Sequence, residues 1–310
     1  MVIGKNSKIM GNFTLKNIPD LDTCVLGALE LLEKEKLPTI KIPYKRPLVV
    51  GSGNAEVTGK IIFKDKDAIF ASESDFESKL KNTKKIDGVV LISASGGKHA
   101  PIIAKISKKY KKHITLLTNN ASAKAEKETD HKHKHDVFLF PKQREPYTYN
   151  TSTYLGMVLG KTKESPKDIL AFIKKLKLPK NIAKYDSYYI IVPEKFDLIR
   201  ELFHTKFDEL FGPKLKGETF TFEQTKHAKT VIPSEKELFI SIGKENKKFG
   251  EKRLYVPLPK NANSGMAMAV GYYIIGKIQK GKPPYFKRNL AKYMKKASKL
   301  FGTKINPIVE

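Results

Sequence analysis

Two short stretches rich in glycine and serine follow apolar runs of the chain. Gly51-Ser52-Gly53-Asn54 comes directly after Leu48-Val49-Val50, and Ser93-Ala94-Ser95-Gly96-Gly97-Lys98 comes directly after Val89-Val90-Leu91-Ile92. Small residues let a backbone approach an anion closely, and hydroxyls, free amides and an ammonium group all bind phosphate oxygens. Neither stretch matches a nucleotide-binding glycine motif. A tight turn that merely needs glycine would explain one such stretch, but two of them favour a phosphate-binding site.

The first half of the chain alternates between strand and helix patterns. Such alternation, with apolar runs of strand length, predicts a doubly wound α/β domain with a parallel sheet. In such sheets ligands bind where strands end at their carboxyl edge, which is where both glycine-rich stretches fall. The predicted strands are 46–52, 68–71, 88–92, 114–117 and 137–140, and the predicted helices include 75–82, 101–110 and 121–128.

The second half repeats this alternation less fully. Its predicted strands 237–242 and 254–258 are too close in sequence for a crossover helix, so this half is interpreted as a shortened copy of the first. The fold class is therefore α/β, with two flavodoxin-like parallel-sheet units, and the expected domains are 1–45, 46–160 and 161–310. The remaining predicted elements are a strand at 188–192 and helices at 21–36, 165–176, 195–211, 262–279 and 285–301.

Composition narrows the class of protein. The 310 residues carry 59 basic and 32 acidic side chains, a formal net charge of +27, but only five of the basic residues are arginines. Lysines scattered along a whole chain indicate solubility more than base recognition, which favours arginine, so nucleic-acid binding is not expected as the main function. No apolar run reaches membrane-spanning length, the start lacks the apolar core of a signal peptide, and Cys24 is the single cysteine, so a cytoplasmic protein is expected.

The basic residues do gather in one region. Ten of them lie between Lys277 and Lys304, with no acidic residue among them. A strong positive field there would attract a small phosphorylated substrate.

Three segments together resemble one known family, the sugar isomerase (SIS) domain proteins. Ser93–Lys98 resembles the Ser-x-Ser-Gly-x-Thr phosphate loop of the family, with Lys98 where threonine is usual. Asn150-Thr151-Ser152-Thr153 is similar to the Ala-Ser-Thr turn that closes the sugar site. Arg288-Asn289-Leu290-Ala291-Lys292 resembles the Pro-Arg-Asn-Leu-Ala-Lys signature, with Lys287 in place of proline. The resemblance spans about residues 20–305 and involves two SIS units, the second of them shortened. Within the family, the chain resembles in particular the isomerase domain of glucosamine-6-phosphate synthase and the archaeal phosphosugar isomerases.

The resemblance implies a role for individual residues. The phosphate would be held by Ser93, Ser95 and Lys98 and by the amides of Gly96 and Gly97. The loop Ser52-Gly53-Asn54 and Ser152 would contact the sugar. Lys292 matches a lysine near the ring oxygen, and His227 matches the histidine that opens the ring from a neighbouring subunit, so a homodimer with a shared site is expected.

The catalytic base is less directly indicated. The family places a glutamate 16 residues before the histidine, and this count from His227 reaches Phe211. A two-residue insertion near Gly212 would restore Glu209 as the base, and Glu218 and Glu223 remain alternatives.

The implied activity is the interconversion of a hexose 6-phosphate between aldose and ketose forms through an enediol, without a cofactor. The fructose 6-phosphate and glucosamine 6-phosphate pair is the first expectation, as a deaminase or an ammonia-dependent isomerase. A phosphoglucose or phosphomannose isomerase and a non-catalytic phosphosugar sensor are the alternatives. The chain opens without the amino-terminal cysteine of a glutaminase, so no glutaminase is expected.

Three histidines alternate with lysines just before the predicted strand 137–140. In an extended chain His131, His133 and His135 would share one face, where a metal ion could bind. They lie in a polar connection, however, and the family that the chain resembles uses no metal, so no metal site is expected.

Overall fold

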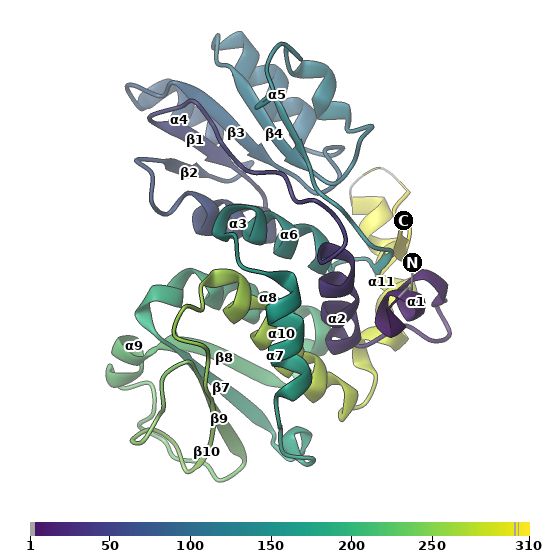
Figure 1. Ribbon diagram of the computed structural model, residues 1–310, viewed down its shortest axis with the longest axis vertical. Helices are drawn as coiled ribbons and strands as arrows, with labels where there is room; N and C mark the ends of the chain where they lie inside the picture. The colour runs from purple at the N-terminus through teal and green to yellow at the C-terminus, as the bar shows by residue number, and fades with distance from the viewer. Residues whose placement is uncertain (1–3, 301, 303) are drawn as a thin grey trace. The chain divides into compact units, whose positions relative to one another are not determined.

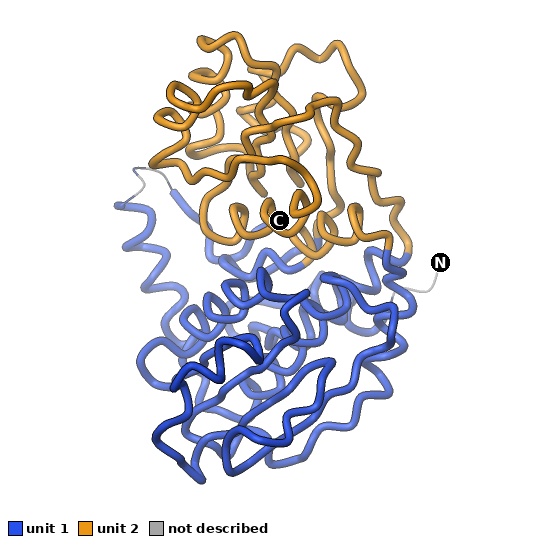
Figure 2. Tube along the Cα trace, turned by 90° about the vertical axis from the view of Figure 1, so that its left-hand side faces the viewer, with its two compact units in different colours: residues 1–33, 143–151, 164–310 blue, residues 34–142, 152–163 orange. Residues whose placement is uncertain are grey.

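The computed structural model describes residues 4–300, 302 and 304–310, which form two compact units (Figure 2). Unit 1 comprises 1–33, 143–151 and 164–310, and unit 2 comprises 34–142 and 152–163. This differs from the expected division into 1–45, 46–160 and 161–310, because helix α2 (Leu21–Leu32) packs against α7 (Pro166–Lys175) and α10 (Ser264–Lys280) inside unit 1. The amino-terminal segment is therefore part of the core of unit 1.

Unit 2 is a doubly wound parallel sheet. Its strand order is β2-β1-β3-β4-β5, and every neighbouring pair is parallel (Figure 1). This is the order of a flavodoxin-like sheet, as expected. The strands are β1 (Pro47–Val50), β2 (Ile69–Ala71), β3 (Gly88–Ile92), β4 (Ile114–Thr118) and β5 (Val137–Leu139). The helices are α3 (Asn54–Phe63), α4 (Phe76–Asn82), α5 (Ala100–Lys109), the 3₁₀ helix η1 (Lys124–Glu128) and α6 (Thr151–Thr162), most of which belongs to this unit.

Helices cover both faces of this sheet. Alternate strand residues such as Val89 and Leu91 pack against α4, α5 and η1 in one buried cluster. On the other face Gly59 of α3 lies so close to Val49 and Ile92 that a Cβ would come within 3.0 Å of both. The buried strands read as continuous apolar runs because each residue meets a helix on one face or the other.

Unit 1 contains a parallel sheet with one strand fewer, in the order β10-β9-β7-β8. Residues 243–251 join β9 to β10 without a helix, as the sequence spacing predicted. The strands are β7 (Ser187–Val192), β8 (Lys216–Thr221), β9 (Glu237–Ile242) and β10 (Lys252–Val256), with a small antiparallel pair β6 (Glu145–Pro146) and β11 (Ile308–Val309). The helices besides α2, α7 and α10 are α1 (Lys5–Asn12), α8 (Arg200–Phe211), α9 (Phe222–Lys226) and α11 (Tyr285–Leu300), with 3₁₀ helices η2 (Ile182–Lys184), η3 (Glu194–Ile199) and η4 (Gly212–Lys214).

Aromatic residues join the sheet of unit 1 to its helices. Phe207 of α8 stacks on Tyr188 of β7, with 6.1 Å between ring centroids, and the ring of Phe203 lies against Gly271 of α10. A Cβ at Gly271 would come within 1.9 Å of the Phe203 ring. Glycine is therefore required where α8 and α10 approach each other.

Several elements differ from the sequence-based expectation. Strand β8 was not predicted, because its sequence Lys-Gly-Glu-Thr-Phe-Thr has no apolar run and only one face of this edge strand is buried. Helices α1 and α6 were not predicted either. The predicted helix 195–211 begins instead as the 3₁₀ helix η3 and becomes α-helical at Arg200. The predicted end of the last helix, Phe301, lies outside the described residues.

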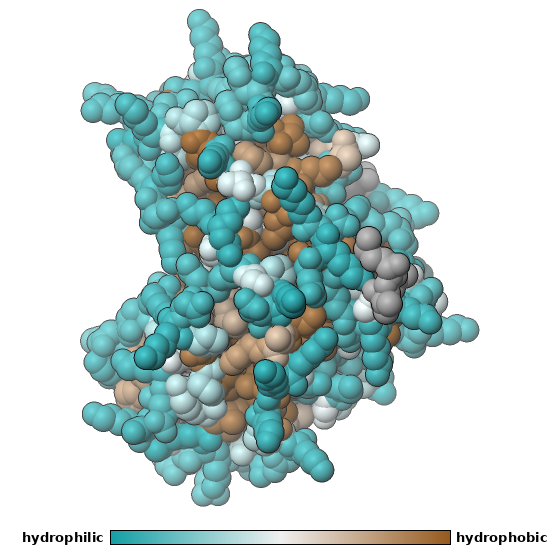
Figure 3. All heavy atoms as spheres, in the orientation of Figure 1, coloured by the Kyte–Doolittle hydropathy of each residue, from teal (hydrophilic) through white to brown (hydrophobic). Residues whose placement is uncertain are grey.

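Two further features of the structure are the distribution of hydrophilic residues on its surface and the character of its helices. On the face shown in Figure 3, hydrophilic residues spread over both units instead of gathering in one patch, as scattered lysines predict. Across 4–300, 302 and 304–310, no helix has the length and apolar character of a membrane span.

Candidate functional site

The two glycine-rich loops of unit 2 lie at the point where the strand order reverses. From β1 the chain crosses through α3 to β2, and from the neighbouring β3 it crosses through α5 to β4 on the other side. Such a switch point leaves a crevice beyond the carboxyl ends of the two strands, where α/β proteins bind ligands. The stretches 51–54 and 93–98 are the connections that leave these two ends.

The loop after β3 is held by its own serines. Ser93 Oγ accepts a hydrogen bond from the Gly96 amide at 3.1 Å, and Ser95 Oγ accepts one from the Gly97 amide at 3.3 Å. Gly96 has a φ of +59°, and a Cβ there would come 2.4 Å from the Cβ of Ala123. The loop conformation therefore requires glycine at this position.

Polar side chains at the end of β4 support this loop from outside. Thr118 Oγ1 donates to the Ala94 carbonyl at 2.8 Å, and Asn120 Nδ2 donates to the Ser95 carbonyl at 2.9 Å. Lys98 is half-buried just before α5, whose amino-terminal end adds a partial positive charge. The loop thus combines two hydroxyls, which can still donate, and a cation on a fixed backbone, and this suits an anionic ligand.

The loop after β1 leads to a side-chain carbonyl oxygen that has no hydrogen-bond partner among the described residues. Gly53 adopts a φ of +54° before α3, and Asn54 is the first residue of that helix. Among the described residues, no group forms a hydrogen bond with Asn54 Oδ1, although this atom is buried. A buried carbonyl oxygen of this kind favours a ligand that donates a hydrogen bond.

Ser152 lies at the same edge of the sheet. It is buried near the start of α6, next to Thr153, whose Oγ1 accepts a hydrogen bond from Asn119 Nδ2 at the end of β4. The structure therefore brings the predicted residues of unit 2 to the carboxyl ends of β1, β3 and β4.

Unit 1 contains a buried ion pair on α8. Lys206 is fully buried, and its Nζ lies 2.6 Å from Glu209 Oε2 and 2.9 Å from the Thr148 carbonyl. Glu209 keeps 21% of its side-chain surface exposed. Burial raises the pKa of Glu209 above its usual range, while the neighbouring Lys206 ammonium opposes that rise. The result is a half-buried carboxylate with a proton affinity above that of an ordinary glutamate.

The backbone around Thr148, whose carbonyl accepts a hydrogen bond from Lys206, has unusual torsion angles. Thr148 and Asn150 have φ values of +81° and +43°, in a region that few residues besides glycine adopt. Glu145 holds this turn, because its Oε2 accepts from the Thr151 amide at 2.6 Å. Strained positions of this kind tend to occur at functional sites.

Glu209 lines a cavity of about 550 Å³ within unit 1. The cavity lies between the carboxyl end of α8 and the first turns of α11, and Tyr285, Asn289 and Tyr293 line it from α11. Its volume is in the range of small-molecule sites. A carboxylate that can exchange a proton and faces such a cavity is suited to general acid–base catalysis.

The alternative carboxylates lie elsewhere. Glu218 on β8 lies 3.8 Å from His204 and 3.4 Å from Lys216, and Glu223 on α9 is exposed and pairs with Lys226 at 2.7 Å. Neither Glu218 nor Glu223 is among the described residues that line the cavity of Glu209. The geometry therefore favours Glu209 over Glu218 and Glu223 as the base.

His227 and Lys292 are exposed. His227 follows the last turn of α9, and Lys292 lies on α11, three residues after Asn289. Neither is among the described residues that line the cavity of Glu209. Their predicted roles stay predictions.

No protein-family model matches the chain, and no curated protein is significantly similar to it. Solved structures are similar, however. The tagatose-6-phosphate ketose/aldose isomerase of Escherichia coli is 12% identical, with a TM-score of 0.59 over 86% of this chain and 89% of that one.

Two further structures match over most of their length. The C-terminal domain of glucosamine-fructose-6-phosphate aminotransferase from Francisella tularensis is 15% identical, with a TM-score of 0.56 over 90% of this chain and 96% of that domain. Glucosamine-6-phosphate deaminase from Thermotoga maritima is 13% identical, with a TM-score of 0.55 over 91% of this chain and 96% of that one. The chain has the SIS fold. The resemblance found in the sequence is confirmed at the level of this fold.

One buried charged residue beside the candidate site, Lys206, was missed by the sequence analysis. Lys206 stands three residues before Glu209, a spacing that places both side chains on one face of a helix. This signal was present, but in a chain so rich in lysine the same spacing recurs at exposed pairs such as Glu223 and Lys226. Only burial distinguishes the two pairs.

Proposed function

We propose that this SIS-fold chain is an aldose–ketose isomerase of hexose 6-phosphates, and that fructose 6-phosphate and glucosamine 6-phosphate are its substrate pair. The observation that carries the proposal is Glu209, a half-buried carboxylate with a raised pKa that lines a cavity of about 550 Å³. Proteins that share the fold include a ketose/aldose isomerase, a glucosamine-6-phosphate deaminase and an aminotransferase domain.

In this proposal the loops of unit 2 bind the substrate. Ser93, Ser95 and Lys98 hold the phosphate, and the unpartnered Asn54 Oδ1 accepts a hydrogen bond from a sugar hydroxyl. Binding energy from the phosphate, which does not react, orients the carbons that do.

Glu209 moves the proton. Its carboxylate takes the proton from C1 of the open-chain ketose; the electrons of that C–H bond form the C1=C2 double bond, and the C2 carbonyl oxygen takes up a proton to give the enediol. The same carboxyl group then returns its proton to C2, while O1 loses its proton and the carbonyl re-forms at C1. With an amino sugar, ammonia first replaces the carbonyl oxygen as an imine and water leaves. His227 opens the sugar ring and Lys292 contacts the ring oxygen, in a homodimer in which the partner supplies His227.

A turnover assay tests the function. Purified chain is incubated with fructose 6-phosphate, with and without ammonium, and the products are separated and identified. We expect ammonium-dependent formation of glucosamine 6-phosphate that is lost in His227→Ala. Formation of glucose or mannose 6-phosphate without ammonium would contradict the amino-sugar substrate and indicate an isomerase of neutral sugar phosphates instead. No product, with a melting temperature still raised by fructose 6-phosphate, would make the protein a sensor and contradict the isomerase.

The phosphate loop offers a matched pair of variants. Gly96→Ala places a Cβ 2.4 Å from Ala123 at a φ of +59°, which strains the loop by about 1–3 kcal/mol. We expect it to weaken fructose 6-phosphate binding about tenfold or more in calorimetric titration. Gly97→Ala is the control, because its Cβ would have no neighbour closer than 3.7 Å and its backbone needs no glycine. Equal affinities in the two variants would contradict the role of this loop.

A further inference from the structure

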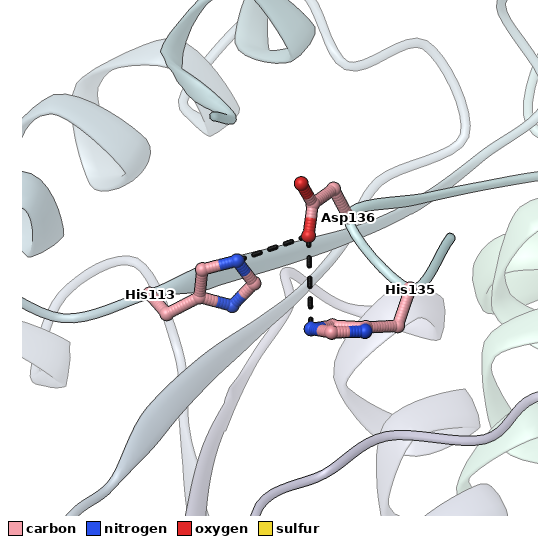
Figure 4. A group of neighbouring side chains, drawn as sticks. All are labelled: His113, His135 and Asp136. Carbon is pink, nitrogen blue, oxygen red and sulfur yellow. Dashed lines mark ion pairs between the residues drawn. The ribbon is translucent and has the colours of Figure 1, made fainter. Parts of the chain in front are cut away.

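A second cluster of functional side chains lies at the opposite edge of the sheet in unit 2. His113 precedes β4, and His135 and Asp136 precede β5, so all three stand at the amino ends of neighbouring parallel strands. Their ligand-type atoms all lie within 4.8 Å of one another (Figure 4). The glycine-rich loops lie at the carboxyl ends, about 16 Å away along a five-residue strand.

One carboxylate oxygen is the centre of this cluster. Asp136 Oδ1 lies 2.9 Å from His113 Nε2 and 3.7 Å from His135 Nε2 (Figure 4). Around a tetrahedral zinc ion with bonds of about 2.1 Å, ligand atoms are separated by roughly 3.4 Å. The two observed distances lie on either side of that value, so small side-chain movements would bring all three atoms around one ion.

The closest pair in the cluster is not a hydrogen bond. Asp136 Oδ1 and His113 Nε2 are both buried, and neither has a hydrogen-bond partner among the described residues despite their separation of 2.9 Å. The other oxygen, Oδ2, already accepts the amides of Lys132 and His133 at 2.9 and 3.0 Å. The backbone therefore orients the carboxylate and leaves Oδ1 directed at the two imidazoles.

The outer ring nitrogen of His113 has its own partner. Tyr44 Oη contacts His113 Nδ1 and lies 2.9 Å from Thr115 Oγ1. If the tyrosine accepts from Nδ1–H and donates to Thr115, the lone pair of His113 is left on Nε2. Histidines that bind metals usually donate the other ring N–H in this way, which fixes the tautomer and the ring orientation.

We propose that His113, His135 and Asp136 bind a divalent transition-metal ion, zinc being the best match. Two imidazole nitrogens and one carboxylate oxygen are typical of zinc, whereas calcium and magnesium prefer oxygen ligands alone. Three protein ligands would leave the fourth position of a tetrahedral ion to a water molecule. This set differs from the three alternating histidines of the sequence, because His131 turns to the Glu126 carbonyl at 2.9 Å.

The site stabilises unit 2 without taking part in turnover. Bound metal would cross-link the starts of β4 and β5, and a ligand that binds only the folded state raises stability. Because the site lies at the opposite edge of the sheet from the phosphate loops, the proposal does not depend on the isomerase activity.

Titration of the full chain with zinc chloride after chelator treatment tests the site. We expect one equivalent of zinc to bind, a raised melting temperature, and visible absorption bands of tetrahedral cobalt when Co²⁺ is used instead. His135→Ala and Asp136→Asn should each lower zinc affinity at least about tenfold and abolish the cobalt bands. Tyr44→Phe keeps the ring that packs over Gly88 and should lower affinity about tenfold through the lost contact with His113.

His131→Ala is the matched control, since this neighbouring histidine points away from the cluster. Its zinc affinity should stay within about twofold of the wild type. Absence of stoichiometric zinc binding to the wild type would overturn the proposal and leave a histidine–aspartate ion pair only. Equal losses in His131→Ala and His135→Ala would also overturn it, because they would indicate adventitious binding to the histidine-rich segment.

Discussion

Glu209→Gln is expected to lower kcat for the conversion of fructose 6-phosphate by about 10²–10⁴-fold, the usual contribution of a general base. The glutamine keeps the size of the side chain and an oxygen that can accept from Lys206, but it cannot take a proton. Because the substituted group acts on the reacting carbons and does not bind the phosphate, KM should change little. Steady-state kinetics with the product quantified directly is the measurement.

Two isosteric variants serve as controls. Glu223→Gln alters an exposed carboxylate on α9, and Glu218→Gln alters one on β8. Both should keep at least about half of the wild-type kcat. If either control lost turnover while Glu209→Gln kept it, the assignment of Glu209 as the base would be wrong. If all three variants kept turnover, none of these carboxylates would be the base.

The pH dependence of turnover reports on the same group. Burial raises the pKa of Glu209 and Lys206 opposes the rise, with a net increase over an ordinary glutamate. The carboxylate must be deprotonated to take a proton from carbon. Turnover should therefore fall as the pH is lowered through this raised pKa, at a higher pH than an exposed glutamate would give, and the acidic limb should be absent from the residual activity of Glu209→Gln.

Lys206→Met is expected to lower the free energy of unfolding by about 3 kcal/mol, the lower end of the cost of breaking a buried ion pair. The substitution leaves the Thr148 carbonyl without its donor and Glu209 without its cation. The lower end applies because Glu209 retains 21% exposure and can be hydrated. Urea unfolding at neutral pH, monitored by circular dichroism, measures the loss.

An exposed pair with the same spacing is the control. Lys226 contacts Glu223 at 2.7 Å from three residues away, but both side chains are more than half exposed. Lys226→Met should leave the free energy of unfolding almost unchanged, because solvent screens an exposed pair. Similar losses in the two variants would mean that burial does not determine the strength of the Lys206–Glu209 pair. Any turnover that Lys206→Met retains should show its acidic limb shifted to higher pH, since the opposing charge has gone.

Much of the fold could be predicted because it is encoded locally. The strand 88–92 was predicted with the bounds that the structure has, since a buried parallel strand is a continuous apolar run. The same reasoning failed for β8, whose residues alternate at an edge of the sheet, and for α1, whose polar sequence becomes helical against α2. There the Glu30 carboxylate accepts from the amide of Ser7 at 2.8 Å and supports the first turn of the helix.

The candidate site divides in the same way. The loops at 51–54 and 93–98 were visible in the sequence, because the glycines and hydroxyls that make them are neighbours along the chain. The strand order then placed both loops at the switch point between β1 and β3, a location that local patterns alone did not fix.

The sequence by itself determined the α/β class, the shortened second sheet and the two glycine-rich loops, and it predicted a set of three candidate carboxylates. Only the tertiary structure showed that Glu209 lines a cavity, joined Lys206 to Thr148 across 58 positions of the chain, and brought His113 to Asp136 in place of His131. The physical reason is that a loop depends on the torsion angles and hydrogen bonds of adjacent residues. A buried charge or a ligand cluster depends on which strands pair and which helices pack, and these contacts join residues that no local pattern connects.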